Sequence, residues 1–126
     1  TTYRKAAIEF AEKTLGYKHN CNYGSHNGTI RMTAGGALKW TDINGYKHIY
    51  NAPNSEFYCV EHPDGIAPAA KCAYTIARYA DTGAPAGIAF KGKTYRTVCF
   101  GFPLETLKEE EDLNSIILKC LAFIAE

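Results

Sequence analysis

The sequence predicts an α/β domain with a mixed, partly antiparallel sheet that is flanked by helices. Apolar residues recur at helical spacing near both ends of the chain, and alternating patterns typical of strands lie between them. The composition, 46% hydrophobic and 21% charged, is that of a globular protein. With a length of 126 residues, we expect residues 1–126 to form a single domain or a fragment of one.

A helix is predicted near each end of the chain. Residues 3–15 carry Ala7, Ile8, Ala11 and Leu15 at helical spacing, and Gly16 follows as a C-terminal stop. Residues 112–125 carry a wider apolar stripe, which we expect to pack onto the sheet. This stripe consists of Leu113, Ile116, Ile117, Cys120, Leu121 and Ile124.

The region between these helices is predicted to contain several strands. Residues 20–28 are polar and rich in glycine and asparagine, so they are interpreted as a loop before a strand at 29–33. Short strands are expected at 37–40, 46–50 and 57–61, with a turn at Asn44-Gly45, and a longer strand at 71–79. The clearest prediction is a hairpin of 86–90 with 95–102.

Composition also bears on partners. The net charge is +1 without a basic block, so we expect no nucleic acid, and no apolar run is long enough for membrane insertion. No Cys and His spacing of a zinc site is present, and we expect neither a metal nor a cofactor. Because the predicted sheet is short of strands, exposed strand edges could pair with a second copy and form a homodimer.

The stretch CFGFPLETL, residues 99–107, contains the first candidate site. A buried strand ends at Pro103, and Glu105 then falls in the following turn. Glu105 is either a cap of a structural junction, where exposed amide groups favour negative charge, or a catalytic carboxylate. In the second interpretation it would act as acid or base with a partner such as Asp81 or Asp64.

The second candidate site is a group of aromatic side chains in the loop-rich middle of the chain. Trp40, Tyr46 and Tyr50 could stack on sugar rings while nearby asparagines bind hydroxyl groups. The alternative is that these aromatics cover one face of the sheet. The first interpretation predicts a carbohydrate partner.

The later part of the chain resembles a bacterial secreted family. The segments that carry the resemblance are RYADTG at 78–83, AGIAFKG at 86–92, YRTV at 95–98 and GFPLET at 101–106, together with FAEKTLG at 10–16. They are similar to the later half of the class I glutamine-amidotransferase-like domain in xanthan lyase-related proteins. The resemblance implies a partial flavodoxin-like scaffold, secretion or a place in the cell envelope, and a link to polysaccharides.

The same resemblance implies that the amidotransferase reaction is absent. Amidotransferases end the corresponding strand with a His-Pro-Glu type junction, in which the histidine serves a cysteine nucleophile. Here the junction is Phe102-Pro103-Leu104-Glu105, which lacks the histidine, and no nucleophile motif is found. We therefore expect a non-catalytic accessory or assembly domain. The alternatives are a carbohydrate-active enzyme that uses Glu105 and a carbohydrate-binding module.

Overall fold

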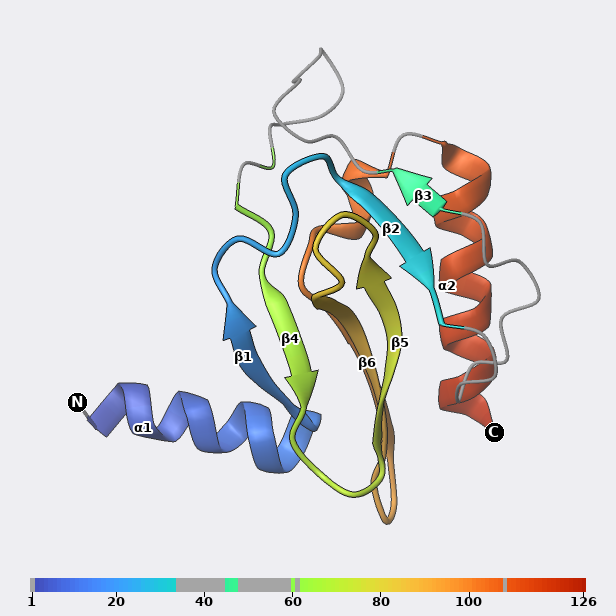
Figure 1. The fold of residues 1–126 in the computed structure, drawn as a ribbon. Coiled ribbons are helices and arrows are strands. Elements are labelled where there is room, and N and C mark those ends of the chain that lie inside the picture. The colour runs from blue at the N-terminus through green and yellow to red at the C-terminus, as the bar shows by residue number, and fades with distance from the viewer. Residues whose placement is uncertain (1, 34–44, 48–59, 61, 108) are drawn as a thin grey trace.

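A computed structural model describes residues 2–33, 45–47, 60, 62–107 and 109–126. The chain forms an α/β structure with two antiparallel sheets and helices at its two ends (Figure 1). The elements are α1 (Thr2–Glu9), the π-helical turn η1 (Phe10–Leu15), β1 (Tyr17–Cys21), β2 (Thr29–Met32), β3 (Gly45–Lys47), β4 (Gly65–Pro68), β5 (Ala73–Tyr79), β6 (Pro85–Lys91), β7 (Arg96–Phe100), the 3-10 turn η2 (Leu104–Thr106) and α2 (Glu110–Ala125).

The larger sheet has the strand order β3-β2-β5-β6-β7, and the smaller sheet consists of β1 and β4. Every pairing among the described strands is antiparallel. The α/β class and the antiparallel part of the predicted sheet are therefore confirmed. The parallel pairs that a mixed or flavodoxin-like sheet requires are not found among the described strands.

The hairpin predicted near the C-terminus is present as β6 and β7. Its register runs from Gly87 opposite Phe100 to Lys91 opposite Arg96. Successive side chains of β6 point to opposite faces of the sheet, so Ile88 and Phe90 join one buried cluster and Ala89 joins another. This alternation explains why a run that is apolar throughout forms a strand buried on both faces.

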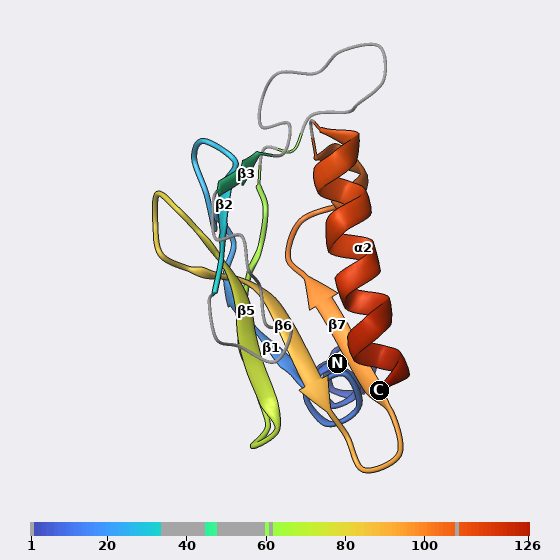
Figure 2. The same cartoon turned by 90° about the vertical axis from the view of Figure 1, so that its right-hand side faces the viewer.

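Three layers result from this two-sided burial. Helix α2 covers one face of the five-stranded sheet, where it contributes to the larger apolar cluster (Figure 2). Ile66 of β4 and the partly buried Tyr17 of β1 pack with Ile88 and Phe90 in the smaller cluster on the opposite face. The small sheet therefore belongs to the second core and is stabilised by packing, which a two-stranded sheet needs.

The stripe predicted for the last helix is only partly correct. Ile116, Cys120 and Phe123 are the buried side chains of α2. Ile117, Leu121 and Ile124 were expected to face the sheet, but each is more than a third exposed. The helix is rotated so that Phe123 takes the buried position, because a single sheet face can cover only part of so wide a stripe.

The first predicted helix is present, but its second half is wound as a π-helical turn. Gly16 ends this turn with a φ of 82°, and its N–H bonds to the carbonyl of Ala11. A side chain at Gly16 would also overlap the ring of Phe90, so both conformation and packing require glycine.

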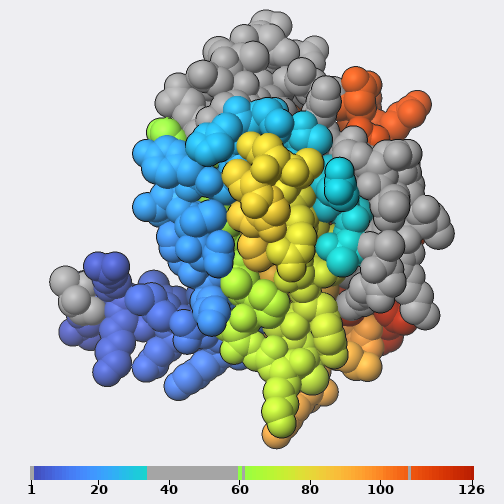
Figure 3. All heavy atoms as spheres, viewed as in Figure 1, coloured from blue at the N-terminus to red at the C-terminus, as the bar shows by residue number. Residues whose placement is uncertain are grey.

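Helix α1 has no buried residue, and it projects from the rest of the molecule (Figures 1 and 3). Within the described ranges, no helix has the length and apolar character needed to cross a bilayer.

The small sheet contradicts one loop prediction. Asn20 and Cys21 were assigned to a loop but belong to β1, and β4 was not predicted at all. The strands expected at 29–33 and 71–79 are confirmed as β2 and β5. Gly45 begins β3, which lies where the strand at 46–50 was expected, whereas residues 37–40 lie outside the described residues.

Candidate functional site

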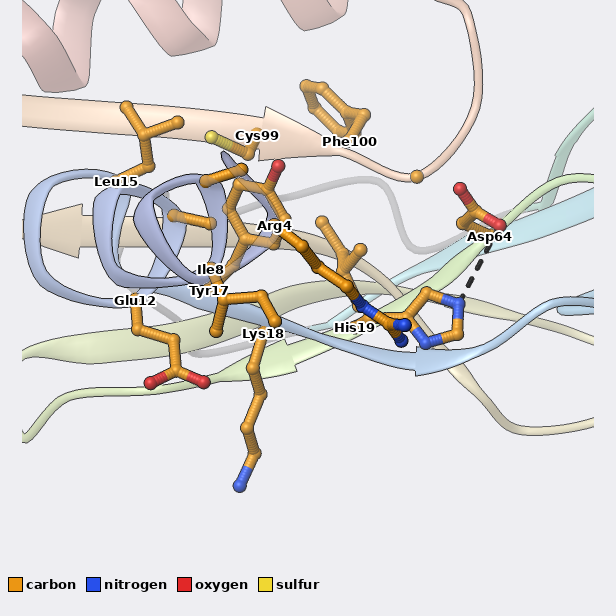
Figure 4. Close-up of a pocket in the computed structure, with 14 residues that line it drawn as sticks. Arg4, Ile8, Glu12, Leu15, Tyr17, Lys18, His19, Asp64, Cys99 and Phe100 are labelled. Atoms are coloured by element: carbon orange, nitrogen blue, oxygen red, sulfur yellow. Dashed lines mark ion pairs between the residues drawn. The ribbon is translucent and has the colours of Figure 1, made fainter. Parts of the chain in front are cut away.

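A cavity of about 580 Å³ lies beneath the N-terminal helix. Its walls come from α1 and η1, from β1 and the start of β4, and from the end of β7 (Figure 4). A volume of this size lies in the range of sites for small molecules. Apolar side chains make up most of the lining, among them Ile8, Leu15, Ile66 and Phe100.

Polar groups gather at one end of the cavity. The Nε2 atom of His19 lies 3.9 Å from Oδ1 of Asp64, and both side chains are more than half exposed. The side chain of Arg4 also lines the cavity and extends toward His19 in the view of Figure 4. Lys18 and Glu12 also line the cavity, but the charged ends of their side chains point away from it.

Backbone contacts fix the position of Asp64. Its N–H bonds to the carbonyl of Gly101 at 2.8 Å, and its carbonyl accepts a bond of 2.7 Å from the hydroxyl of Tyr79. Burial, followed by the charges of Asp64 and Cys21, raises the pKa of Tyr79, so its hydroxyl group stays protonated and donates. Two hydrogen bonds therefore hold the backbone of Asp64 at the edge of the cavity.

Cys99 is the thiol that lines the cavity. Burial raises the pKa of this thiol, and a hydrogen bond with the Thr97 side chain opposes the shift only in part. Because the thiolate is the reactive form of cysteine, a raised pKa makes Cys99 a poor nucleophile at neutral pH. Cys99 instead packs with the smaller apolar cluster.

The carboxylates predicted as an acid–base pair have different surroundings. Glu105 lies in the first turn of η2, as expected, and its side chain is exposed. Of the three carboxylates considered, Asp64 lines the cavity and Glu105 and Asp81 do not. The structure thus places Asp64 at the cavity, whereas the sequence indicates this residue only as a partner of Glu105.

Asp81 is bonded to the loop that precedes β2. Its carboxylate accepts hydrogen bonds from the Ser25 hydroxyl at 2.9 Å and from the backbone N–H of His26 at 2.7 Å. Partial burial opposes ionisation, but the bonds from His26 and Ser25 outweigh it and lower the pKa of Asp81. These contacts give Asp81 a structural role, since they join the loop to the turn between β5 and β6.

The predicted aromatic site lies mostly outside the described residues. Trp40 and Tyr50 fall in the segments that are not described, and Tyr46 is placed in β3 opposite Ile30. Tyr17, another tyrosine of the loop-rich region, lines the cavity instead. Tyr23 is exposed and makes an edge-to-face contact with His62, with ring centroids 4.6 Å apart.

The junction after β7, residues 101–106, contains a core aromatic side chain. Phe102 is only 4% exposed, and its ring centroid lies 5.5 Å from that of Phe100 and 6.4 Å from that of Tyr79. Pro103 ends the extended segment, and the Thr106 hydroxyl bonds back to the Pro103 carbonyl at 2.6 Å. The junction is therefore a packed and internally bonded turn.

Comparison with protein-family models, with curated proteins and with solved structures finds no match for this chain. Among the side chains that the structure describes, no three His, Cys, Asp or Glu residues gather as metal ligands would. No local motif could have revealed the cavity, because its walls combine residues from Arg4 to Gly101. The sequence signal nearest to it was Asp64, which lies in a turn motif.

Proposed function

We propose that this chain is a non-catalytic accessory domain of a secreted or envelope-bound, polysaccharide-related protein. The observation that carries the proposal is the environment of Phe102. A buried phenyl ring, packed against Tyr79 and Phe100, occupies this position. By the resemblance described in the sequence analysis, an amidotransferase would carry its catalytic histidine here. A phenyl ring can neither accept nor donate the proton that amide hydrolysis requires.

The thiol and carboxylate environments support the same proposal. Cys99 is the thiol in the cavity, and burial disfavours its reactive form. Asp81 is occupied by hydrogen bonds to the Ser25–Gly28 loop, and Glu105 lies on an exposed turn. In this proposal Glu105 stabilises the start of η2, and the domain contributes binding or assembly, with carbohydrate as the partner class.

A carbohydrate-active enzyme is the second candidate. The observation that favours it is the hydrogen bond from the Asp64 N–H to the Gly101 carbonyl. Gly101 lies only four residues before Glu105 in the chain, so this bond ties Asp64 to the segment that carries Glu105. Asp64 would then be the second carboxylate of the pair.

Two measurements separate these functions. The purified chain should show no turnover of glutamine, small amides or bacterial polysaccharides. In affinity electrophoresis, its migration should be slower in a gel that contains a polysaccharide to which it binds than in a gel without it. Turnover that disappears in Glu105→Gln, while Lys108→Gln keeps it, would establish the enzyme and reject the accessory role. A chain that neither binds nor turns over any polysaccharide would contradict the carbohydrate link.

The proposal also includes the scaffold and the oligomeric state. In an amidotransferase-like, flavodoxin-like domain, the β6–β7 hairpin, η2 and α2 would form the closing part, next to parallel strands from elsewhere in the parent protein. Among the described strands, β1 pairs only with β4, so the other edge of β1 is where a second copy would add in a homodimer. Light scattering after size-exclusion chromatography should show a dimer, and a monomer at high concentration would contradict this part.

A further inference from the structure

We propose that the cavity beneath α1 binds an uncharged small molecule with an apolar body, and that α1 packs against this molecule. The site is separate from the accessory role proposed above, because it needs no polysaccharide and Glu105 does not line it. Two features of the structure carry the proposal: the exposure of α1 and the balance of charges in the lining of the cavity.

Helix α1 meets the cavity where a helix normally meets a core. None of its eight residues is buried. An isolated helix of this length is marginal in water, and helices in proteins are stabilised mainly by the packing of an apolar face. Ala7 and Ile8 line the cavity, and Ile8 is 48% exposed. The apolar side of α1 is therefore turned toward a hollow.

The end of the helical segment is anchored to the β6–β7 hairpin. The hydroxyl of Tyr95 donates to the carbonyl of Thr14 at 2.7 Å, and the hydroxyl of Thr97 donates to the carbonyl of Leu15 at 2.9 Å. These bonds fix the C-terminal end of η1. A molecule in the cavity would add the contacts that α1 needs along its own length.

The other walls of the cavity favour an apolar body. Ile66 of β4 and Cys99 and Phe100 of β7 line it together with Leu15 (Figure 4). A hydrocarbon chain or an aromatic ring gains by leaving water and needs no hydrogen bonds against such walls. A sugar would leave several hydroxyl groups without partners there, which is costly.

The charged side chains of the lining favour no charged ligand. Two are positive and two are negative: Arg4, Lys18, Glu12 and Asp64. At pH 8 an ordinary imidazole group is uncharged, so the formal charges of the lining cancel. Arg4 already has an interaction partner within the chain, and Oδ1 of Asp64 lies 3.9 Å from Nε2 of His19. A charged ligand would therefore lose hydration without meeting an excess of opposite charge.

Isothermal titration calorimetry at pH 8 tests the charge of the ligand with three probes of equal chain length: octan-1-ol, octanoate and octylamine. Octan-1-ol should bind one to one. Octanoate and octylamine should each bind about tenfold or more weakly, since each brings a charge that the lining does not compensate. Methyl glucoside, an uncharged sugar, should also bind more weakly than octan-1-ol.

Hydrogen exchange measured by nuclear magnetic resonance tests the packing of α1. With octan-1-ol at about ten times its dissociation constant, the amides of residues 6–9 should exchange about tenfold more slowly, because binding competes with local opening of the helix. The turn at residues 80–84 does not line the cavity, and its exchange rates should stay within about twofold.

Two apolar side chains of the helical segment provide a matched pair of variants. Ile8 lines the cavity and Phe10 does not, and Phe10 is 56% exposed. Ile8→Ala should weaken octan-1-ol about fivefold, because part of the apolar contact is lost, whereas Phe10→Ala should leave it within about twofold. Neither side chain is buried, and circular dichroism confirms that both variants are folded.

Several outcomes would overturn the proposal. These are octanoate or octylamine binding as tightly as octan-1-ol, unchanged exchange in α1 at saturation, equal losses in Ile8→Ala and Phe10→Ala, and no binding of any probe at millimolar concentration. Methyl glucoside that binds more tightly than octan-1-ol would also overturn it, because the ligand would then be a sugar. None of these results changes the expected absence of turnover, so the accessory role is tested separately.

Discussion

At the scale of single residues, Gly101 decides how β4 meets the end of β7. Its carbonyl accepts the N–H of Asp64, and its own N–H bonds to the carbonyl of Ala86, each at 2.8 Å. A side chain at this position would overlap the backbone carbonyl of Asp64, which cannot rotate away as a side chain could. The position of Asp64 at the polar end of the cavity therefore depends on the absence of a side chain at Gly101.

Replacing Gly101 by alanine should strongly destabilise the fold. The added methyl group forces Asp64 and β7 apart, and we expect a loss of about 3 kcal/mol or more in the free energy of unfolding. Urea denaturation followed by circular dichroism measures this loss.

Gly83 provides the control for Gly101→Ala. It has a φ of 76°, but a side chain there would meet no atom within 4 Å. Gly83→Ala should therefore cost only the strain of the left-handed conformation, about 1–2 kcal/mol. Equal losses in the two variants would show that the Asp64 contact does not limit this position.

Asp81 predicts a pH-dependent stability. Its pKa is lower in the fold than the usual 3.8, so folding favours the ionised carboxylate. The contribution of Asp81 is then complete at neutral pH and is lost as the pH falls below about 4, through the pKa of the folded state. Asp81→Asn should be less stable than the wild type at pH 7, and the difference should shrink on acidification.

Ser25→Ala is the companion variant for this measurement. It removes the hydroxyl that bonds to Asp81 and also accepts the N–H of Gly28 at 2.9 Å. The serine variant should lose part of the same pH-dependent stability. A difference between wild type and Asp81→Asn that stays constant from pH 7 to pH 3 would contradict the assigned hydrogen bonds.

At the scale of elements, α2 shows what sequence periodicity can predict. The apolar spacing located the helix almost to its ends, because 3.6-residue periodicity is a local property of the chain. The same spacing could not tell which part of a wide stripe meets the sheet. That choice depends on the side chains of β2, β5 and β6, which contribute to the larger cluster.

Two adjacent isoleucines of α2 test the observed rotation of the helix. Ile116 is fully buried and Ile117 is 38% exposed. Ile116→Ala should cost about 2–5 kcal/mol, because it leaves a cavity, and Ile117→Ala should cost less than about 1 kcal/mol. Chemical denaturation of both variants measures the difference, and a larger loss at Ile117 would place the other side of the stripe against the sheet.

The two strands of the small sheet could not be predicted from the sequence. β1 has three exposed residues in its centre, Lys18, His19 and Asn20, so it lacks the alternation that identifies a strand. β4 has only four residues, including a glycine and a proline. Both strands form because they pair with each other and pack on Ile88 and Phe90, which are distant in sequence.

At the scale of the whole molecule, the candidate site depends on the small sheet of β1 and β4. The cavity exists because β1 and β4 cover one face of the large sheet while η1 turns the N-terminal helix across the end of β7. Glu105 could be singled out because its signal is local, a strand ended by proline. The Arg4, His19 and Asp64 group could not, since it comes from three separate segments of the chain.

The docking of α2 links one thiol to the stability of the whole molecule. Cys120 is 8% exposed in the larger cluster, and burial raises its pKa to about 11, whereas Cys72 is exposed. Because the thiolate reacts with iodoacetamide, Cys72 should be labelled within minutes at pH 8, and Cys120 only when the cluster opens. Mass spectrometry of the peptides distinguishes the two sites.

The labelling rate of Cys120 should therefore follow global unfolding. Low urea concentrations should accelerate it in proportion to the loss of stability, and Ile116→Ala should accelerate it further, while the rate at Cys72 stays constant. Rapid labelling of Cys120 without urea would mean that α2 detaches on its own. The cluster shared by α2 and strands β2, β5 and β6 argues against such detachment, because the helix cannot leave without exposing the core of the large sheet.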